Sequence, residues 1–119
     1  MKNSESLKKT SDFQKVYKKK KSKAKKYLIM YIYKNNMNIN RIGISCSKKV
    51  GNSVVRHRMT RLIREAYRLH EEYFNIGLDM VVVVRPSAKD VGYQEMSSAL
   101  MHLANLHHIT RRKLQKKVL

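Results

Sequence analysis

Two stretches in the first half of the chain alternate between apolar and other side chains with the period of a β-strand. In residues 27–34 (YLIMYIYK) the alternation separates Leu28, Met30 and Ile32 from Ile29, Tyr31 and Tyr33. In residues 41–47 (RIGISCS) it separates Ile42, Ile44 and Cys46 from Gly43, Ser45 and Ser47. The intervening residues 35–40 (NNMNIN) tolerate turn conformations and suggest a hairpin. One face of this sheet is therefore predicted to be core. The other face is small, polar and partly aromatic, and is expected to be open to a ligand.

Three further segments have helical spacing. Ser11 and Asp12 are typical of a helix start and predict a short helix through about residue 17. Asn52 or Ser53 is predicted to cap a second helix, and Gly77 to mark its exit turn. The apolar residues of this second helix fall within one arc, namely Val55, Met59, Leu62, Ile63, Ala66 and Leu69. Residues 93–107 repeat the pattern with Met96, Ala99, Leu100, Leu103 and Leu106.

Residues 79–85 (DMVVVVR) form a continuous β-branched run, which is typical of a strand covered on both faces. The predicted order is α, β, β, α, β, α, and the fold class is α+β, a small α/β sandwich. The 119 residues allow one domain over 1–119. The basic N-terminal segment 1–26 and the tail 108–119 are its candidate mobile ends.

The charge is strongly positive and unevenly placed. Lys and Arg number 27 against 8 Asp and Glu, a formal net charge of +19. Residues 1–68 carry 20 of the basic residues and only three acids. Such an excess opposes compaction through self-repulsion and indicates a polyanionic partner, with nucleic acid first. The run at residues 18–26 (KKKKSKAKK) is interpreted as a solvated, mobile basic loop, which is compatible with phosphate contact but cannot read a base sequence.

The second predicted helix has a cationic side opposite its apolar arc. His57, Arg61, Arg64 and Arg68 cluster there, flanked by Arg56 and Arg58. A merely solvated helix would need acids among these arginines, and only Glu65 is present. Arginine suits bidentate phosphate contact, and Lys48, Lys49 and the helix N-terminus add positive potential. The pattern indicates nucleic-acid binding without choosing between RNA and DNA.

Aromatic side chains lie near the basic run. Phe13 and Tyr17 share a helix face at i and i+4, and Tyr31 and Tyr33 lie on the non-core side of a strand. An isolated pair of rings can equally be core. Rings beside Lys and Arg, however, can stack on unpaired bases, so these residues are candidate RNA contacts.

No catalytic or metal-binding constellation is recognisable. The five histidines lack acidic or cysteine partners, and neither a P-loop nor an HExxH or GxSxG motif occurs. His107 and His108 are interpreted as a helix-end pair facing different directions, and Cys46 as a buried small hydrophobe. A lone cysteine fits a reducing cytosol, the N-terminus lacks the apolar region of a signal peptide, and no apolar run reaches the roughly 20 residues of a membrane span. A cytoplasmic protein is therefore expected.

Several motifs resemble the bacterial ribonuclease P protein subunit family, in one order from about Leu7 to Leu106. They are Leu7-Lys8-Lys9, Asp12-Phe13, Val16-Tyr17, Arg41-Ile42-Gly43-Ile44-Ser45, Ser47-Lys48-Lys49-Val50-Gly51-Asn52, Arg56-His57-Arg58 and Arg61-Leu62-Ile63-Arg64-Glu65. The stretch at residues 47–65 is a specific signature rather than a generic basic helix. This sequence departs from the family pattern at His57, where the pattern has Asn, and at Thr60, where it has Lys.

The resemblance implies a ribosomal-protein-like fold with a left-handed β-α-β crossover, against the right-handed default. It implies the protein component of an endoribonuclease in which a catalytic RNA, using Mg²⁺ bound mainly by that RNA, removes the 5′ leader of precursor tRNA. Partners would be these two RNAs, without DNA or membrane, and no protein group would be catalytic or bind metal. The implied contacts with the catalytic RNA are Lys48, Lys49, Asn52, Arg56, His57, Arg58, Arg61, Arg64 and Arg68. The implied contacts with the leader, in a cleft between the first helix, the sheet and the basic helix, are Phe13, Tyr17, Tyr31 and Ser45.

Three other hypotheses are weighed beside this one. A structural RNA-binding protein, such as a ribosomal component, would share the basic face but would not need aromatic rings on the sheet. A DNA-binding module would place the arginine helix in a major groove and would favour side chains that read base edges and a dimer seam, neither of which is evident. A protein-only nuclease conflicts with the shortage of carboxylates.

Overall fold

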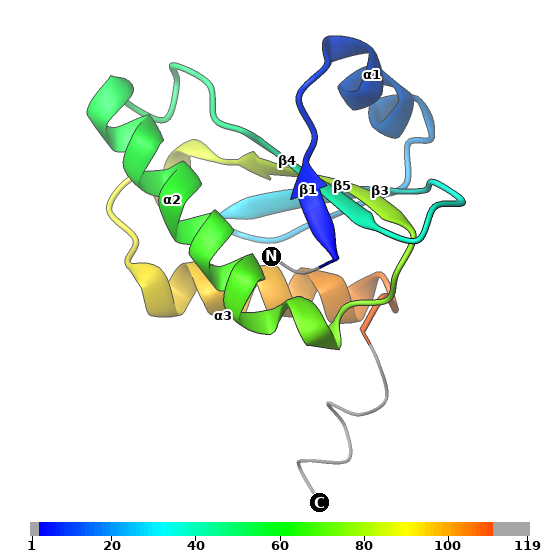
Figure 1. The fold of residues 1–119 in the computed structure, drawn as a ribbon. Helices are drawn as coiled ribbons and strands as arrows, with labels where there is room; N and C mark the ends of the chain where they lie inside the picture. Colours follow the sequence, from blue (N-terminus) through cyan, green and yellow to red (C-terminus); the bar gives the residue numbers. More distant parts are fainter. Residues whose placement is uncertain (1–2, 111–119) are drawn as a thin grey trace, which may run out of the picture.

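The computed structural model describes residues 3–110 as three layers, with α1 above a five-stranded sheet and α2 and α3 below it (Figure 1). The elements are β1 (Ser4–Ser6), α1 (Thr10–Lys18), β2 (Ser22–Ala24), β3 (Leu28–Lys34), β4 (Asn40–Ser45), α2 (Ser53–His70), β5 (Leu78–Val84) and α3 (Tyr93–Leu106). Single 3₁₀ turns at Glu71–Tyr73 and Pro86–Ala88 flank β5. The predicted order of helices and strands is confirmed, with β1 and β2 as additional short strands at the sheet edges.

The sheet order is β1-β4-β5-β3-β2, so β5 is the central strand. β4 runs parallel to β5 and β3 runs antiparallel to it. The predicted hairpin between β3 and β4 is therefore wrong, because β5 lies between them. Six of the seven residues of β5 are buried, and a strand that is apolar on both faces is stable only when both faces and both edges are covered.

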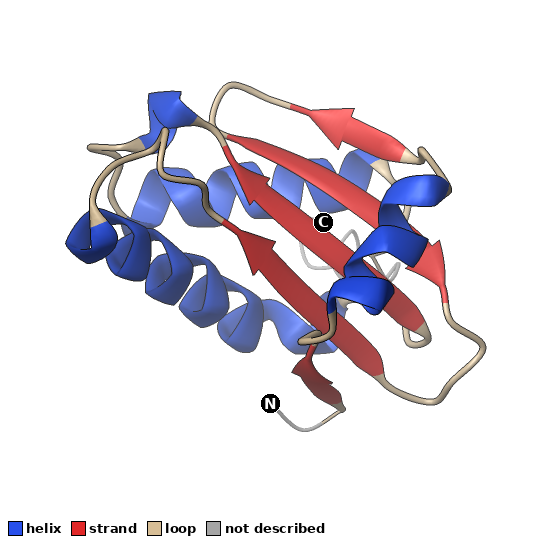
Figure 2. Cartoon of the chain, turned by 90° about the horizontal axis from the view of Figure 1, so that it is seen from above, coloured by secondary structure: helices blue, strands red, loops and turns tan. Residues whose placement is uncertain are grey.

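The crossover from β4 through α2 to β5 is left-handed, as the resemblance implied. In Figure 2, viewed from the α1 side, β4 and β5 point the same way and α2 returns behind the sheet. The side-chain register accounts for this hand. Ile42 and Ile44 of β4 face the main core, whereas Gly43 faces α1. A right-handed return would place the apolar arc of α2 on the wrong face of β4.

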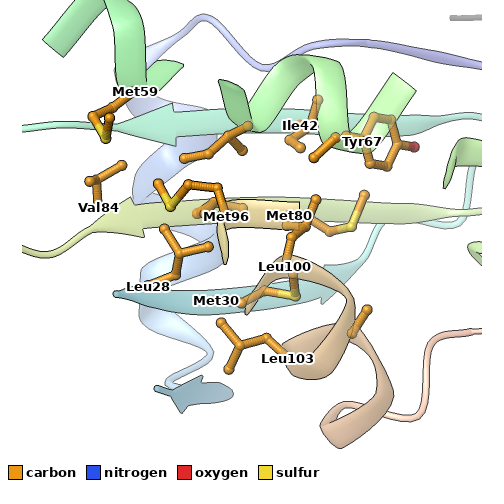
Figure 3. Close-up of a cluster of buried hydrophobic side chains, with 14 of the residues drawn as sticks. Leu28, Met30, Ile42, Met59, Tyr67, Met80, Val84, Met96, Leu100 and Leu103 are labelled. Atoms are coloured by element: carbon orange, nitrogen blue, oxygen red, sulfur yellow. The ribbon is translucent and has the colours of Figure 1, made fainter. Parts of the chain in front are cut away.

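The main core lies between the sheet and the pair α2 and α3, and methionines fill much of it (Figure 3). Met59 and Ile63 of α2 and Leu100 and Leu103 of α3 are fully buried, as their spacing predicted. Two apolar positions were assigned wrongly. Leu69 is 53% exposed and Leu106 is 37% exposed, because each lies in the last turn of its helix, at the margin of the packed surface.

Tyr67, which the apolar arc omitted, is buried at the end of α2 nearest β1. Its hydroxyl lies 2.6 Å from Ser4 Oγ, and Asn40 Nδ2 donates to it. Asn40 also donates to the Asn75 carbonyl at 2.8 Å and accepts from the Leu78 amide at 2.9 Å. Asn40 was predicted to be a turn residue. It is instead a buried first residue of β4, whose amide satisfies polar groups that the core would otherwise leave unpaired.

The sequence predictions for two helix starts, for the turn at Gly77 and for the lysine run can be compared with the structure. Asn52 caps α2, accepting from the Val55 amide, as predicted. α1 begins at Thr10 after Lys9, which makes no side-chain cap, so Ser11 is not the N-cap, whereas Asp12 does lie in the first turn as predicted. Gly77 does adopt a positive φ of 92°, but it precedes β5, several residues after α2 ends at His70. The residues predicted as a mobile basic loop include β2, which pairs with β3, and β1 likewise pairs with β4. The end of the tail, residues 111–119, lies outside the described residues.

Candidate nucleic-acid interface

The cationic surface follows the outer side of α2 and the turn before it. Lys48 and Lys49 are exposed in that turn. Along the helix the exposed candidates are Asn52, His57, Arg58, Arg61 and Arg68, and the half-buried ones are Arg56 and Arg64. Asn52 is at the same time the helix cap, so its side-chain oxygen Oδ1 already accepts from the Val55 amide. The structure thus places every predicted contact of the basic group on one helix and its entry turn.

Several of these arginines are held in place by the fold. Arg58 Nη2 donates to the Val91 carbonyl at 3.2 Å, and Arg64 Nη1 donates to Ser6 Oγ at 2.7 Å. Arg68 pairs with Glu65, the acid within α2. Arg56 Nε is buried and has no hydrogen-bond partner among the described residues. Tethered guanidinium groups lose less side-chain entropy when they bind phosphate, so this surface is arranged for a polyanion before binding.

A second surface, which we call the aromatic face, consists of Phe13, Tyr17, Tyr31 and Tyr33 on the α1 side of the sheet. All four rings are partly exposed and pack on Leu7, Val16 and Val81. The Tyr17 and Tyr31 rings meet edge to face, with centroids 4.9 Å apart. The structure therefore brings the predicted aromatic residues together, from a helix and a strand, on the sheet face opposite the main core.

Gly43 explains how Phe13 reaches this face. A Cβ at position 43 would lie 2.5 Å from Phe13 Cζ and 3.2 Å from Leu7 Cβ, so only glycine leaves room for the ring against β4. Ser45 lies two residues further along β4, on the same face, and is partly exposed. The four predicted leader contacts therefore share one side of the sheet.

An ion-pair network that sequence reasoning missed ties α1 to this sheet. Asp79, fully buried at the start of β5, accepts from Arg41 Nε at 2.9 Å and from Asn35 Nδ2 at 2.8 Å. Arg41 also reaches Asp12 of α1 at 3.4 Å. The hydrogen bond to Asp79 raises the pKa of Arg41. The sequence contains one indication of this network. Asp79 is a single carboxylate before an apolar run, and a charge buried in a strand requires a partner of opposite charge.

The histidines and the cysteine were the other candidates for chemistry in the described part of the chain. Within residues 3–110, no three His, Cys, Asp or Glu side chains come close enough to hold a metal ion. His107 is buried and its Nε2 lies 2.8 Å from the Met30 carbonyl, whereas His108 is exposed, so the pair faces different directions as predicted. Cys46 is half-buried against the core, and this burial raises the pKa of its thiol. None of the described helices is long and apolar enough to cross a membrane.

A small α+β protein with an arginine-rich helix and exposed rings on its sheet has the features of an RNA-binding protein. Residues 1–107 match the protein family described as Ribonuclease P. The chain is 62% identical over 106 residues to the ribonuclease P protein component of Lachnoclostridium phytofermentans, covering 89% of this chain and 91% of that protein. It is 49% identical over 98 residues to that of Clostridioides difficile, covering 82% and 86%.

Solved structures agree. The Staphylococcus aureus RNase P protein superimposes with a TM-score of 0.82 at 34% identity, covering 89% of this chain and 97% of that one. The Thermotoga maritima RNase P protein gives 0.77 at 27% identity, covering 82% and 93%. The chain therefore belongs to the ribonuclease P protein family. It is the protein component of a ribonucleoprotein endoribonuclease that removes the 5′ leader of precursor tRNA, with cleavage performed by the RNA.

Proposed function

We propose that the protein, in the cytoplasm, binds two RNAs with two separate surfaces. α2 and its entry turn bind the folded catalytic RNA, and the aromatic face binds the single-stranded 5′ leader of precursor tRNA. The observation that carries the proposal is the separation of side-chain types. α1 and α2 lie on opposite sides of the sheet (Figure 1), with guanidinium groups along α2 and the rings on the α1 side.

The two surfaces suit two kinds of RNA. Folded RNA presents rigid arrays of phosphates, which arginines held by Val91 and Ser6 can contact with little loss of entropy. A leader is unpaired and varies in sequence, and aromatic rings stack on any base. The turn between Ser45 and Asn52 connects the two surfaces, so the leader and the catalytic RNA meet at this end of the sheet.

We place Mg²⁺ on the catalytic RNA. Magnesium requires oxygen ligands in octahedral geometry, and the described residues do not form a carboxylate cluster that could supply them. The contribution of the protein is therefore electrostatic and positional. Its cations lower the repulsion between phosphates in the assembled enzyme, and its rings hold the leader beside the cleavage site.

The test replaces Tyr17 by Ala and measures the affinity of the assembled enzyme for precursor tRNA and for mature tRNA. Loss of one stacked base costs about 1–3 kcal/mol, so the precursor should bind roughly ten-fold more weakly while mature tRNA is unaffected. Tyr27→Ala is the matched control, because Tyr27 is a half-buried tyrosine that packs on the main core instead. Equal loss for both tRNAs would assign Tyr17 to the core or to the interface with the catalytic RNA.

Stimulation of processing tests the same proposal at the level of activity. Purified protein added to the catalytic RNA should increase 5′ processing at low Mg²⁺ concentration, because its cations replace part of the charge screening that the metal provides. A protein that binds the RNA without stimulating cleavage would fit a purely structural role.

A further inference from the structure

Two adjoining pockets lie at the corner of the sheet where β3 ends, and the surface functions described above do not use them. One, of about 490 Å³, lies between the end of β3, residues 75–78 and the end of α3. The other, of about 360 Å³, lies between Lys19, Tyr33 and Asn36. They share four lining residues, Lys21, Ile32, Lys34 and Asn36, so they adjoin each other, and we call the two together the lysine corner.

The lysine corner is cationic without compensation from its own lining. Lys19, Lys21 and Lys34 line it and are all exposed, and no acidic residue is among the lining residues. Lys19 Nζ lies 5.6 Å from the centroid of the Tyr33 ring. His107 also lines the corner. Burial, and to a lesser degree the positive charges of Lys21 and Lys23, lower the pKa of its imidazole below the ordinary value. Gathered like charges of this kind are stabilised when an anion binds among them.

The rest of the corner suits a flat, partly polar group. Its lining includes Ile32, Leu78 and Ile109, which are buried, and Met37 and Ile76, which are 44% and 38% exposed. His107 donates from Nε2 to the Met30 carbonyl, and its Nδ1 is buried, so neither ring nitrogen is open to a ligand. The exposed side chains of Met37 and Ile76 beside a rim of lysines match an unpaired base attached to a phosphate.

The corner adjoins the aromatic face at Tyr33, which belongs to both. Ile32 and Lys34 alternate with Tyr33 along β3 and therefore face the α3 side, where His107 and Ile109 line the corner. The corner thus begins beside Tyr33 on the α1 side and passes around the end of β3 to the α3 side. The register aligns Ser45 with Val83 and Ile29 at one end of the sheet face, and Arg41 with Asp79 and Tyr33 at the other. Ser45 and Arg41 are four residues apart along β4, which is about 13 Å at the usual strand rise of about 3.3 Å per residue. The corner therefore lies at the end of the sheet away from Lys48, Lys49 and the start of α2.

We propose that the lysine corner is a second single-stranded RNA site, which binds leader nucleotides distal to the cleavage site. This inference rests on the proposed leader path across the aromatic face. A leader that starts beside the catalytic RNA, near Ser45, crosses the rings on the α1 side and passes around the end of β3 beyond Tyr33, so that its distal nucleotides reach the corner. Lys19, Lys21 and Lys34 bind their phosphates, and one unpaired base lies against the apolar lining.

The experiment measures the affinity of the assembled enzyme for precursor tRNAs whose leaders are lengthened one nucleotide at a time. Lys34→Glu is the test variant, and Lys89→Glu is the control, because Lys89 is an exposed lysine outside the corner with the same change of charge. For the parent protein, affinity should rise again once the leader is long enough to reach the corner. Lys34→Glu should abolish this second rise, weakening long-leader binding about ten-fold, as expected for loss of a charge-assisted hydrogen bond. Short-leader and mature tRNA binding should not change.

Met37→Ala is a second variant, since Met37 is exposed and its loss does not disturb the core. It should also weaken the binding of long leaders only, through the lost contact with a base. The inference is overturned if Lys34→Glu changes mature tRNA, short and long leaders equally, or if it leaves the second rise intact. If the parent protein does not distinguish precursor from mature tRNA at all, the proposed leader path itself fails, which is a different outcome.

Discussion

Replacing Gly43 by Ala tests the packing that places Phe13 on the aromatic face. The added Cβ would lie 2.5 Å from Phe13 Cζ and 2.8 Å from Cε1, so either the ring or α1 must move. Overpacking costs about 1–3 kcal/mol and relief of the strand glycine returns about 0.5–1 kcal/mol, so we expect a net loss of about 1–2 kcal/mol in the free energy of unfolding. Urea denaturation measures this loss.

The companion variant Phe13→Leu removes the two ring atoms that the new Cβ would meet. Gly43→Ala should therefore cost much less in the Phe13→Leu background, with a coupling energy of about 1 kcal/mol or more between the two substitutions. The displaced ring should also weaken precursor tRNA binding without affecting mature tRNA. Strictly additive stability effects, or a Gly43→Ala variant as stable as its parent, would refute the close approach of Phe13 to β4.

Three further predictions concern buried charge, the basic helix and pH. Asp79→Asn should lower the free energy of unfolding in urea by about 3 kcal/mol, because it breaks a buried ion pair from one side. Arg61→Ala should weaken catalytic-RNA binding in a titration and leave the melting temperature unchanged, whereas Arg64→Ala should lower both, because Arg64 also bonds to β1. Burial holds the pKa of His107 below 6.5, so the unfolded state binds the extra proton first. Its contribution to stability should be complete above about pH 6.5 and be lost as pH falls toward the folded-state pKa, and urea titrations from about pH 7.5 to 5.5 should show a flatter dependence for His107→Gln.

Most local features were predictable because they depend on neighbours in the sequence. Period-2 alternation assigned Leu28 and Met30 to the core and Tyr31 to the other face, and the structure confirms this. The Asn52 cap and the buried stripe of α2 follow from helical period alone. The three-residue strands β1 and β2 were missed, since their few, mostly polar residues have no hydrophobic pattern and take strand conformation only by pairing with β4 and β3.

The pairing of the strands could not be predicted from the local sequence pattern. Residues 35–40 permit a tight turn, yet β3 and β4 are separated by β5, which has the largest need for burial on both faces. The same choice brings Asp79 beside Arg41 and Asn40 beside the Leu78 amide, contacts 38 residues apart in the chain. Polar residues of types that favour turns and surfaces thus form hydrogen bonds between strands in the folded protein.

The sequence by itself determined which faces are apolar, which helix carries the arginines, and, through its motifs, the family to which the chain belongs. Only the tertiary structure decided that Phe13 and Tyr17 meet Tyr31 above Gly43, and that Lys19, Lys21 and Lys34 gather at one corner with Tyr33. The physical reason is that sequence periodicity depends on neighbouring residues, whereas tertiary packing depends on the whole chain. Periodicity states which side of an element is buried, but the partner that covers it is selected by the competition of all elements for the same core.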